Sequence, residues 1–318
     1  GEAVVHASVS EMLPHVDVVA VFSPNDTRLA VIEEVAAGGE HLKGLIIEKP
    51  LGRNLAEARR IVELADRLGV PTAYFENQIH MKAITNARAQ LDATARATGP
   101  LVLARSGEEH AGPHNAWFWD PTLQGGGVLS DMGCHSIAVG WHLLTPPDRG
   151  VRHLVPETVS AEVGLLKWGQ PRWRAQLLET YGVDYTQTPA EDFATGIVTY
   201  RDPDTDHRSK AQFTVSWMYD KQGLRLLMDG IGPGYALEVN TLRSPLEVFI
   251  GDDAASSVAD AETALHSIVV NGSVARMRHG DKSMEWNAQN VGTLRAYIAE
   301  LRGRLGLPGR GFARRVSF

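Results

Sequence analysis

The N-terminal third of the chain alternates between short apolar runs and longer stretches with helical periodicity. The apolar runs lie at residues 17–22, 44–47 and 71–75. Runs of this length that end in polar turns are typical of strands buried in a parallel sheet. The helical stretches lie at residues 27–37, 54–68 and 82–97. This alternation predicts right-handed crossovers and a parallel sheet, whose ligands bind beyond the carboxyl ends of the strands.

The second of these helices has the clearest boundaries. Asn54 is typical of a helix N-cap, and Gly69 is typical of the residue that ends a helix. We expect one apolar face to pack against the sheet. The predicted members of that face are Leu55, Ala58, Ile61, Val62 and Ala65.

After Gly99 and Pro100 the pattern changes to strands separated by short turns. Strands are predicted at residues 101–108, 158–167, 193–200, 210–217, 224–230 and 235–240. Turns rich in Gly, Pro and Asp favour antiparallel pairing. Helices are predicted at residues 130–144 and 286–305. The expected fold class is α/β, with a parallel-sheet domain over residues 1–98 and an α+β domain with a large, mostly antiparallel open sheet over residues 99–318.

Charge and cysteine content narrow the class of partner. The formal net charge of −7 argues against nucleic acid, because phosphates are bound by clustered Lys and Arg. No apolar run in the sequence approaches the roughly 20 residues that span a bilayer. The single cysteine, Cys134, excludes an intrachain disulfide and fits a reducing cytoplasm. We therefore expect a cytoplasmic protein whose partner is a small molecule rather than nucleic acid or a membrane.

The tripeptide Glu48-Lys49-Pro50 directly follows the second apolar run. Pro50 biases Lys49 toward an extended backbone, which ends the strand and brings the ammonium group to the edge of the sheet. A lysine held beside a cofactor can have a lowered pKa and can hydrogen-bond a substrate oxygen. A solvated lysine in a turn is the alternative, and the tripeptide alone favours it, because short motifs often occur by chance.

A glycine-rich segment, residues 125–135, holds a second candidate group. Its sequence is Gly-Gly-Gly-Val-Leu-Ser-Asp-Met-Gly-Cys-His. Asp131 and His135 share a face if the segment is helical, and the carboxylate can then orient the imidazole. The glycines allow a close approach to a ligand or a sharp turn, and Gly133 indicates close packing. A structural Asp–His pair at the start of a helix is the alternative.

Three aromatic residues, Trp117, Phe118 and Trp119, stand just before this segment. They are candidates for the wall of a sugar or nicotinamide pocket. Aromatic clusters of this kind more often belong to the hydrophobic core.

Taken in order, the strand, the Glu-Lys-Pro motif and the pattern Gly-Gly-Gly-x-Leu-x-Asp-x-Gly-x-His resemble the glucose–fructose oxidoreductase / inositol dehydrogenase / MocA (Gfo/Idh/MocA) family. The resemblance covers residues 4–144. It implies a partial Rossmann-type domain, followed by a domain for substrate binding and oligomerisation. It implies an NAD- or NADP-dependent oxidoreductase that moves a hydride to or from a hydroxyl or carbonyl carbon of a sugar, inositol or related polyol. It also implies a homo-oligomer that pairs through the antiparallel sheet.

The resemblance assigns roles by position. The catalytic residues it implies are Lys49, Asp131 and His135. His135 would act as general base or acid, Asp131 would support it, and Lys49 would polarise the same substrate oxygen. The cofactor contacts are expected at Ser23, Pro24, Asn25, Glu48, Lys49, Pro50 and Asn77, with Trp119 as a further candidate. No metal ligand is implied.

The sequence departs from the family at its start. We find no Gly-x-Gly-x-x-Gly turn to hold the pyrophosphate, and residues 2–8 resemble the family's third strand. We therefore expect the first two strands to be absent, which leaves the strand at 17–22 as an open edge and the choice between NAD and NADP undecided. Arg28 stands where the family often has histidine, and residues 306–318 do not resemble the family's usual ending.

Three other functions are compatible with these motifs. Relatives on the same fold include nicotinamide-dependent glycosidases and reductases of other substrates. A chain without a pyrophosphate site could instead be an inactive fragment. A metal-dependent hydrolase would need ligands whose spacing here matches no zinc signature: His110, His114, Asp120, Asp131 and His135.

Overall fold

The computed structural model describes residues 3–221, 223–240, 247–249, 275–279, 282–286 and 291–304. By its internal contacts the chain divides into two units. The first comprises Gly1–Tyr219 and Leu224–Thr241, and the second comprises Asp220–Gly223 and Leu242–Phe318. The boundary predicted between residues 98 and 99 falls inside the first unit and stays a prediction.

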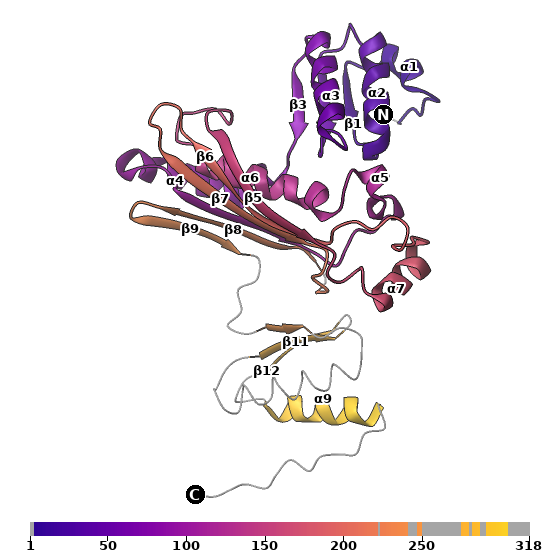
Figure 1. Ribbon diagram of the computed structural model, residues 1–318, viewed down its shortest axis with the longest axis vertical. Coiled ribbons are helices and arrows are strands. Elements are labelled where there is room, and N and C mark those ends of the chain that lie inside the picture. The colour runs from indigo at the N-terminus through magenta and orange to yellow at the C-terminus, as the bar shows by residue number, and fades with distance from the viewer. Residues whose placement is uncertain are drawn as a thin grey trace, which may run out of the picture. The chain divides into compact units, whose positions relative to one another are not determined.

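Three short strands form a parallel sheet in the order β1-β2-β3, as predicted. They are β1 (Val18–Val21), β2 (Gly44–Glu48) and β3 (Thr72–Phe75). Two helices, α2 (Asn25–Gly38) and α3 (Leu55–Leu68), connect them and lie beside the sheet (Figure 1). Among the described residues β1 pairs only with β2, so it forms the open edge that the sequence predicts.

The ends of α3 follow the sequence prediction, and its buried face follows it in part. Asn54 Oδ1 accepts a hydrogen bond from the Glu57 N–H at 3.0 Å, and Gly69 ends the helix with a φ of 68°. Ile61 and Ala65 are buried as predicted. Leu55 and Val62 are 65% and 46% exposed, so their predicted place on the packed face is wrong. Leu64 is buried instead.

The N-terminal segment is not the strand that the sequence predicts. Residues 3–8 have no regular structure, and Val4 and Val5 are 75% and 93% exposed. The short helix α1 (Val9–Met12) follows, capped by the Ser8 hydroxyl, which accepts a hydrogen bond from the Glu11 N–H. The prediction of a third-strand equivalent at residues 2–8 is therefore wrong over the residues that are described.

Six strands form the second sheet of the first unit. They are β4 (Leu103–Glu109), β5 (Val155–Gly164), β6 (Phe193–Arg201), β7 (Arg208–Ser216), β8 (Arg225–Gly232) and β9 (Tyr235–Asn240). Their order is β5-β6-β7-β4-β8-β9. Only the β4–β7 pairing is parallel, so the sheet is mostly antiparallel, as predicted.

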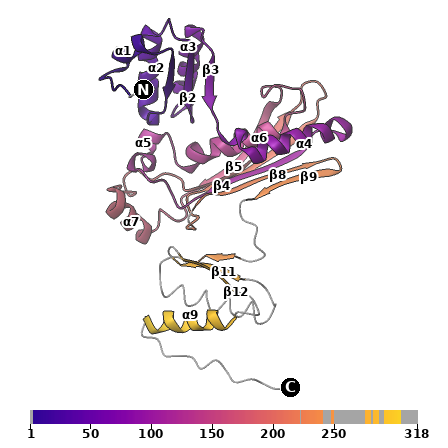
Figure 2. The same ribbon diagram turned by 180° about the vertical axis from the view of Figure 1, so that it is seen from behind.

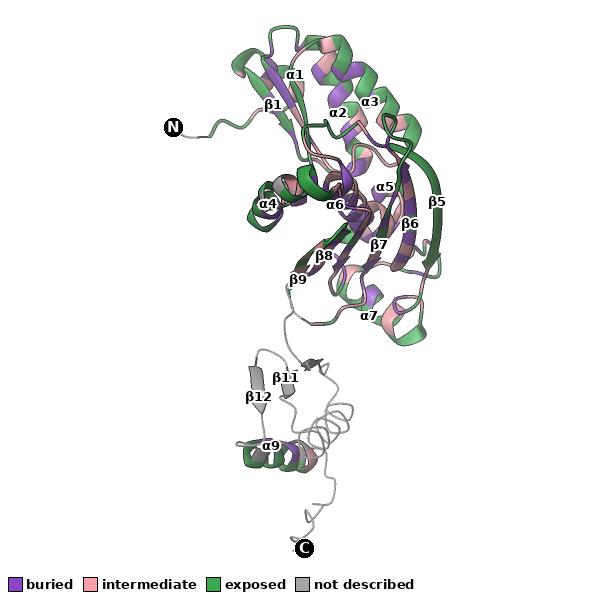
Figure 3. Ribbon diagram, turned by 90° about the vertical axis from the view of Figure 1, so that its left-hand side faces the viewer, coloured by how far each residue is buried: buried purple, intermediate pink, exposed green. Residues whose placement is uncertain are grey.

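Helices α4 (Lys82–Thr98) and α6 (Cys134–Leu144) run alongside this sheet (Figure 2). Gly140 allows α6 to approach β7 closely, because a Cβ atom there would lie 2.9 Å from the Ala211 Cβ. The strands alternate buried and exposed positions, and β5 is largely exposed (Figure 3). Ile197 of β6 and Ile231 of β8 are 42% and 39% exposed and lie on the face opposite the buried positions, so that face of the sheet is open.

Other elements complete the chain. The helix predicted at 130–144 is a π-helical turn, η4 (Leu129–Gly133), followed by α6. Helices α5 (Pro121–Gln124) and α7 (Pro171–Tyr181) were not predicted. The second unit contains β10 (Glu247–Phe249), β11 (Ala275–His279), β12 (Lys282–Trp286) and α9 (Val291–Arg304). Residues 306–318 lie outside the described part, and no helix within that part has the length and apolarity to cross a membrane.

Candidate active site

Polar side chains converge at the carboxyl ends of three strands in the first unit. Lys49 follows β2, Glu76 follows β3, and Glu108 lies near the end of β4. Asp131 from η4 and His135 from α6 join them. The three acids and the histidine are each 5–6% exposed. The structure thus brings the three predicted catalytic residues into one buried cluster.

Lys49 is anchored by Asp131. Its Nζ donates to the Asp131 backbone oxygen at 2.8 Å and to Oδ1 at 3.1 Å. Burial by itself lowers the pKa of Lys49, but Asp131, Cys134 and Glu108 together outweigh burial, and the pKa lies above its ordinary value. This ammonium group therefore stays charged at neutral pH.

Asp131 has two further neighbours that the sequence did not indicate. Its Oδ2 accepts a hydrogen bond from the Trp217 Nε1–H at 3.2 Å and lies 4.0 Å from His110 Nε2. Nδ1 of His110 accepts a hydrogen bond from the Gly112 N–H at 3.0 Å, and burial lowers the pKa of His110. The carboxylate of Asp131 is therefore held between Lys49 and Trp217.

His135 takes its carboxylate partner from Glu76. Its Nδ1 lies 2.7 and 2.8 Å from the two Glu76 oxygens. Asp131, from the π-helical turn Leu129–Gly133, directs its carboxylate to Lys49 and Trp217 instead. In this structure the carboxylate that holds His135 is therefore Glu76 and not the predicted Asp131. The position of Glu76, directly after a parallel strand, is the sequence signal that points to it.

Glu108 extends the cluster through Gln78. The Gln78 Nε2 donates to Glu108 Oε2 at 2.6 Å, and the Gln78 backbone N–H donates to Glu76 Oε1 at 2.9 Å. Burial raises the pKa of Glu108, although His135, Gln78 and Lys49 each oppose this effect. No sequence motif singles out Glu108. Its place follows from the register of β4 in the sheet.

The single cysteine, Cys134, lies beside the cluster, and its thiol is not reactive. The Cys134 Sγ donates to the Asp131 backbone oxygen at 3.2 Å. Burial raises the pKa of Cys134 to about 12. The thiol stays protonated at neutral pH and is a poor nucleophile.

The glycine run packs against the protein's own backbone. A Cβ atom on Gly125 would lie 2.5 Å from the Arg53 backbone, and one on Gly127 would lie 2.1 Å from the Glu191 backbone oxygen. The Gly127 N–H donates to Glu191 Oε1 at 2.9 Å. The glycines therefore allow the chain to turn into η4, and Gly133 packs against Leu129 as the sequence indicates.

A second polar group lies after β1, where the first cofactor contacts are predicted. Asn25 Nδ2 donates to the Gln124 backbone oxygen at 2.8 Å. Arg28 is 2% exposed, and its guanidinium donates to the Ser23 backbone oxygen at 2.9 Å and to that of Pro50. Ser23 Oγ and both side-chain amide atoms of Gln124 are buried without a hydrogen bond. Buried polar atoms normally have partners, so this group is suited to a polar ligand.

The other predicted cofactor residues lie along the same edge of the parallel sheet. Pro24 precedes α2 and is exposed, and Glu48 ends β2 and is half-buried. The peptide bond between Lys49 and Pro50 is cis. Asn77 is exposed at the start of the turn after β3. Their contacts with a cofactor stay predictions.

Trp119 lies in the core rather than on a cavity wall near the cluster. It is 1% exposed, and its Nε1–H donates to the Pro113 backbone oxygen at 3.2 Å. Its ring packs against Trp168, Tyr185 and Trp217. This placement favours the structural interpretation of Trp119 over the predicted cofactor contact.

Metal ligands do not converge at this cluster. Over the described residues, one group of three potential ligands meets: His153, Asp202 and Asp204. The five residues that a metal-dependent hydrolase would use are not in that group. The hydrolase alternative therefore has no supporting geometry in this part of the chain.

Two family models match the first unit. The model of the oxidoreductase family with an NAD-binding Rossmann fold (GFO_IDH_MocA) matches residues 2–75, and the GFO/IDH/MocA C-terminal domain matches residues 86–230. The chain belongs to the Gfo/Idh/MocA family of NAD-binding oxidoreductases. A third model, gpW, matches residues 253–316, most of which lie outside the described part.

This chain matches only part of the length of its relatives. The uncharacterized protein YMR315W of Saccharomyces cerevisiae is 30% identical over 149 residues, which cover 44% of this chain and 40% of the yeast protein.

Solved structures show the same fold. GenD2 from gentamicin A biosynthesis, in complex with NAD, is 24% identical with a TM-score of 0.57, covering 75% of this chain and 59% of GenD2. Levoglucosan dehydrogenase with NADH and levoglucosan is 16% identical with a TM-score of 0.55, covering 71% of this chain and 55% of that enzyme. A probable dehydrogenase from Thermotoga maritima is 17% identical with a TM-score of 0.55, covering 75% and 62%.

Proposed function

We propose that the protein transfers a hydride between a nicotinamide cofactor and a hydroxyl or carbonyl carbon of a sugar or polyol. One observation carries the proposal: a charged lysine and a carboxylate-held imidazole are buried together at the carboxyl edge of a parallel sheet. Interconversion of an alcohol and a carbonyl needs a proton acceptor and a group that binds the oxygen. Levoglucosan dehydrogenase and GenD2, which share the fold, were solved with NADH and NAD respectively.

His135 is the proposed general base. Because Glu76 holds Nδ1 of His135, the proton of the neutral ring lies on Nδ1 and the Nε2 lone pair is left to accept a proton. In oxidation, Nε2 takes the proton of the substrate hydroxyl. In reduction, the imidazolium returns that proton to the alkoxide oxygen.

Lys49 is the proposed oxygen-binding group. An ammonium group has three donors, and two of them go to Asp131. The third donor can bind the substrate oxygen and stabilise negative charge that develops on it. Asp131 keeps the ammonium charged and fixes its direction.

A bound nicotinamide cofactor would supply the hydride acceptor or donor. The residues after β1, together with Gln124 of α5, fit such a group. Ser23 Oγ and the Gln124 amide are buried polar atoms without hydrogen-bond partners. Ser23, Asn25 and Lys49 would hold it. Further contacts are proposed at Pro24, Glu48, Pro50 and Asn77.

Nicotinamide fluorescence tests the proposal. NADH and NADPH are titrated into this chain and into a version extended upstream in the gene. We expect saturable binding to the extended version at least, weakened about fivefold by Ser23→Ala because a hydrogen bond of roughly 1 kcal/mol is lost. Ser10→Ala, on the exposed side of α1, is the matched control. Absence of binding to both versions contradicts the proposal.

We also propose that copies of the chain pair through the open face of the six-stranded sheet. Exposed apolar side chains on that face support this pairing: Ile197 and Ile231. Light scattering on wild type and Ile197→Glu tests it, and an unchanged mass in both contradicts it.

A further inference from the structure

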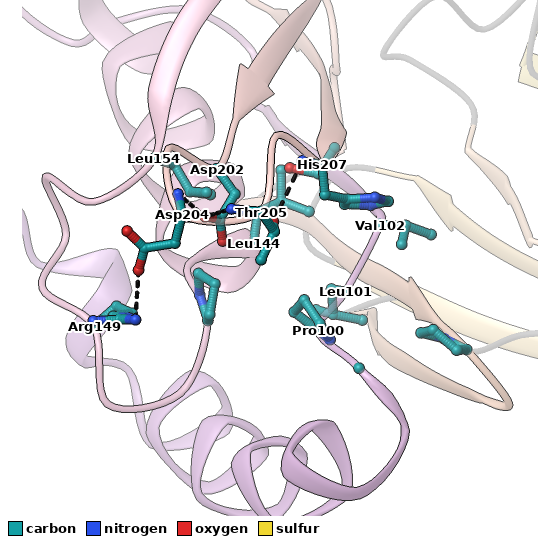
Figure 4. A pocket seen from close by; sticks show the side chains of 14 residues that line it. Pro100, Leu101, Val102, Leu144, Arg149, Leu154, Asp202, Asp204, Thr205 and His207 are labelled. Carbon is teal, nitrogen blue, oxygen red and sulfur yellow. Dashed lines mark hydrogen bonds and ion pairs between the residues drawn. The ribbon is translucent and has the colours of Figure 1, made fainter.

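An apolar cavity beside the six-stranded sheet lies away from the active site. It has a volume of about 460 Å³ and lies where the chain enters β4 and leaves α6 (Figure 4). Leu101, Leu144 and Leu154 form part of its apolar wall. Glu108 and His135 lie at the opposite ends of the same strand and helix. The cavity is therefore separate from the cluster described above.

One side of this cavity is polar. It is formed by the turn between β6 and β7, which contributes Asp202 and Asp204 to the lining. Figure 4 shows both carboxylates and the ion pair of Asp204 with Arg149, whose Oδ2–Nη2 distance is 2.5 Å. Asp202 Oδ1 accepts hydrogen bonds from the backbone N–H groups of Asp204 and Thr205, at 2.8 and 3.2 Å. The Asp202 carboxylate is thus fixed in place before any ligand binds.

A histidine from a different segment completes the group. His153 precedes β5, and its Nε2 lies 3.2 Å from Asp202 Oδ1. The side chains of His153 and Asp202 are only 12% and 11% exposed. His153 Nε2 is buried without an aligned hydrogen bond. One ligand atom from each of His153, Asp202 and Asp204 lies within 4.8 Å of the others.

This arrangement favours a cation over a simple ion pair. A ring nitrogen and a carboxylate oxygen that lie 3.2 Å apart without an aligned hydrogen bond can both direct a lone pair at one cation. Two ligands about 2.0–2.1 Å from a tetrahedral zinc ion are about 3.3 Å apart, close to the separation seen here. Arg149 offsets one of the two negative charges and leaves the other.

We propose that His153, Asp202 and Asp204 form a binding site for a divalent transition-metal cation such as Zn²⁺. One imidazole nitrogen with two carboxylate oxygens suits such an ion better than Mg²⁺ or Ca²⁺, which prefer oxygen ligands alone. The remaining coordination position faces the cavity and can take water or an oxygen of a small molecule. A bound ion would link the segment before β5 to the β6–β7 turn.

Zinc binding by the full chain tests the site. The chelator-treated protein is titrated with ZnCl₂ by calorimetry, and melting is followed with ZnCl₂ and with MgCl₂. We expect one zinc ion per chain and a rise of several degrees in Tm, with little effect of magnesium. Co²⁺ added in place of zinc should give the visible absorption of a tetrahedral nitrogen–oxygen site.

Variants decide whether the ion is bound at this site. His153→Gln should weaken zinc binding at least tenfold and abolish the rise in Tm. Asp204→Asn is the second variant. Asp202 is not replaced, because it also fixes the turn and its replacement would disrupt folding more. His114→Gln, an exposed histidine elsewhere in the first unit, is the matched control and should bind as wild type does. Absence of saturable binding overturns the proposal, and so does binding that His114→Gln removes or that His153→Gln leaves unchanged.

Discussion

The two ends of strand β4 carry polar clusters of different construction. At the carboxyl end, every charged group has a partner from another element. Lys49 pairs with Asp131, and His135 pairs with Glu76. Such pairing holds each group in one position, as preorganised groups for proton transfer require.

At the other end of β4 the pairing is incomplete. His153 and Asp202 lie in contact without an aligned hydrogen bond, and the Asp204 side chain is half exposed. The comparison teaches that burial alone does not distinguish an active site from a ligand site. Charged side chains that all have a partner are held in position for a reaction, whereas a buried donor or acceptor without a hydrogen bond indicates a place for a ligand.

The largest expected effect is a loss of turnover when the imidazole of His135 is removed. His135→Ala should reduce turnover about 10²–10⁴-fold, the usual contribution of a general base, with cofactor affinity nearly unchanged. Lys49→Ala should impair both turnover and cofactor binding. Steady-state kinetics and NADH fluorescence measure these quantities. His80→Ala, on the exposed turn after β3, is the control. Normal turnover of His135→Ala would remove this residue from the mechanism.

The second effect concerns the stability of the lysine–aspartate pair. Asp131→Ala leaves the Lys49 ammonium buried without its carboxylate, and we expect a loss of about 3 kcal/mol in the free energy of unfolding. Lys43 and Asp17 form an exposed pair, with side chains 72% and 67% exposed. Asp17→Ala should therefore cost less than about 1 kcal/mol. Urea unfolding compares the two variants, and equal losses would contradict a special role for the buried pair.

The third effect tests the turn that carries Asp131. Gly127→Ala places a Cβ atom 2.1 Å from the Glu191 backbone oxygen, so backbone must move. We expect a loss of about 1–3 kcal/mol, as for other overpacked sites. Gly150→Ala has no atom within 4 Å of the added Cβ and is the matched control. Thermal melts that show the same Tm for both variants would argue against tight packing at this turn.

The smallest effect concerns Glu108, whose pKa is raised by burial. Below the ordinary pKa of 4.5 this group is protonated in both folded and unfolded chains. As pH rises above that value, the unfolded chain releases the proton more readily, so the wild-type chain loses stability. Glu108→Gln should remove this loss and still accept the hydrogen bond from Gln78. Unfolding at several pH values should show a gain in stability near neutral pH that vanishes below the ordinary pKa of 4.5; a gain independent of pH would contradict the assignment.

The sequence predicted those parts of the fold that depend on local pattern. The strands of the parallel sheet are short apolar runs bounded by turn residues, and Asn54 and Gly69 mark the ends of α3. Helix α7, which was not predicted, also has a local signal in the sequence. Pro171 stands at its first position, and Trp173, Leu177 and Tyr181 follow at helical spacing.

The contacts that define the candidate site depend on the tertiary fold. Glu76 and His135 are 59 residues apart, and Trp217 meets Asp131 across 86 residues. Periodicity carries no information about such pairs. The edge of a parallel sheet is predictable, however, and it narrows the candidates to residues that follow strands, Lys49 and Glu76 among them. In the structure the π-helical turn Leu129–Gly133 directs Asp131 to Lys49 and Trp217, and Glu76 holds the imidazole that the sequence spacing had assigned to Asp131.

That turn has a consequence for how relatives can diverge. A π-helical turn holds one residue more than an α-helical turn, so it arises from a single-residue insertion. A relative without the extra residue would wind the segment as ordinary helix, which would turn the preceding side chains by about 100° relative to α6. The direction of Asp131 toward Lys49 and Trp217 therefore depends on the length of this turn as well as on the identity of the residue.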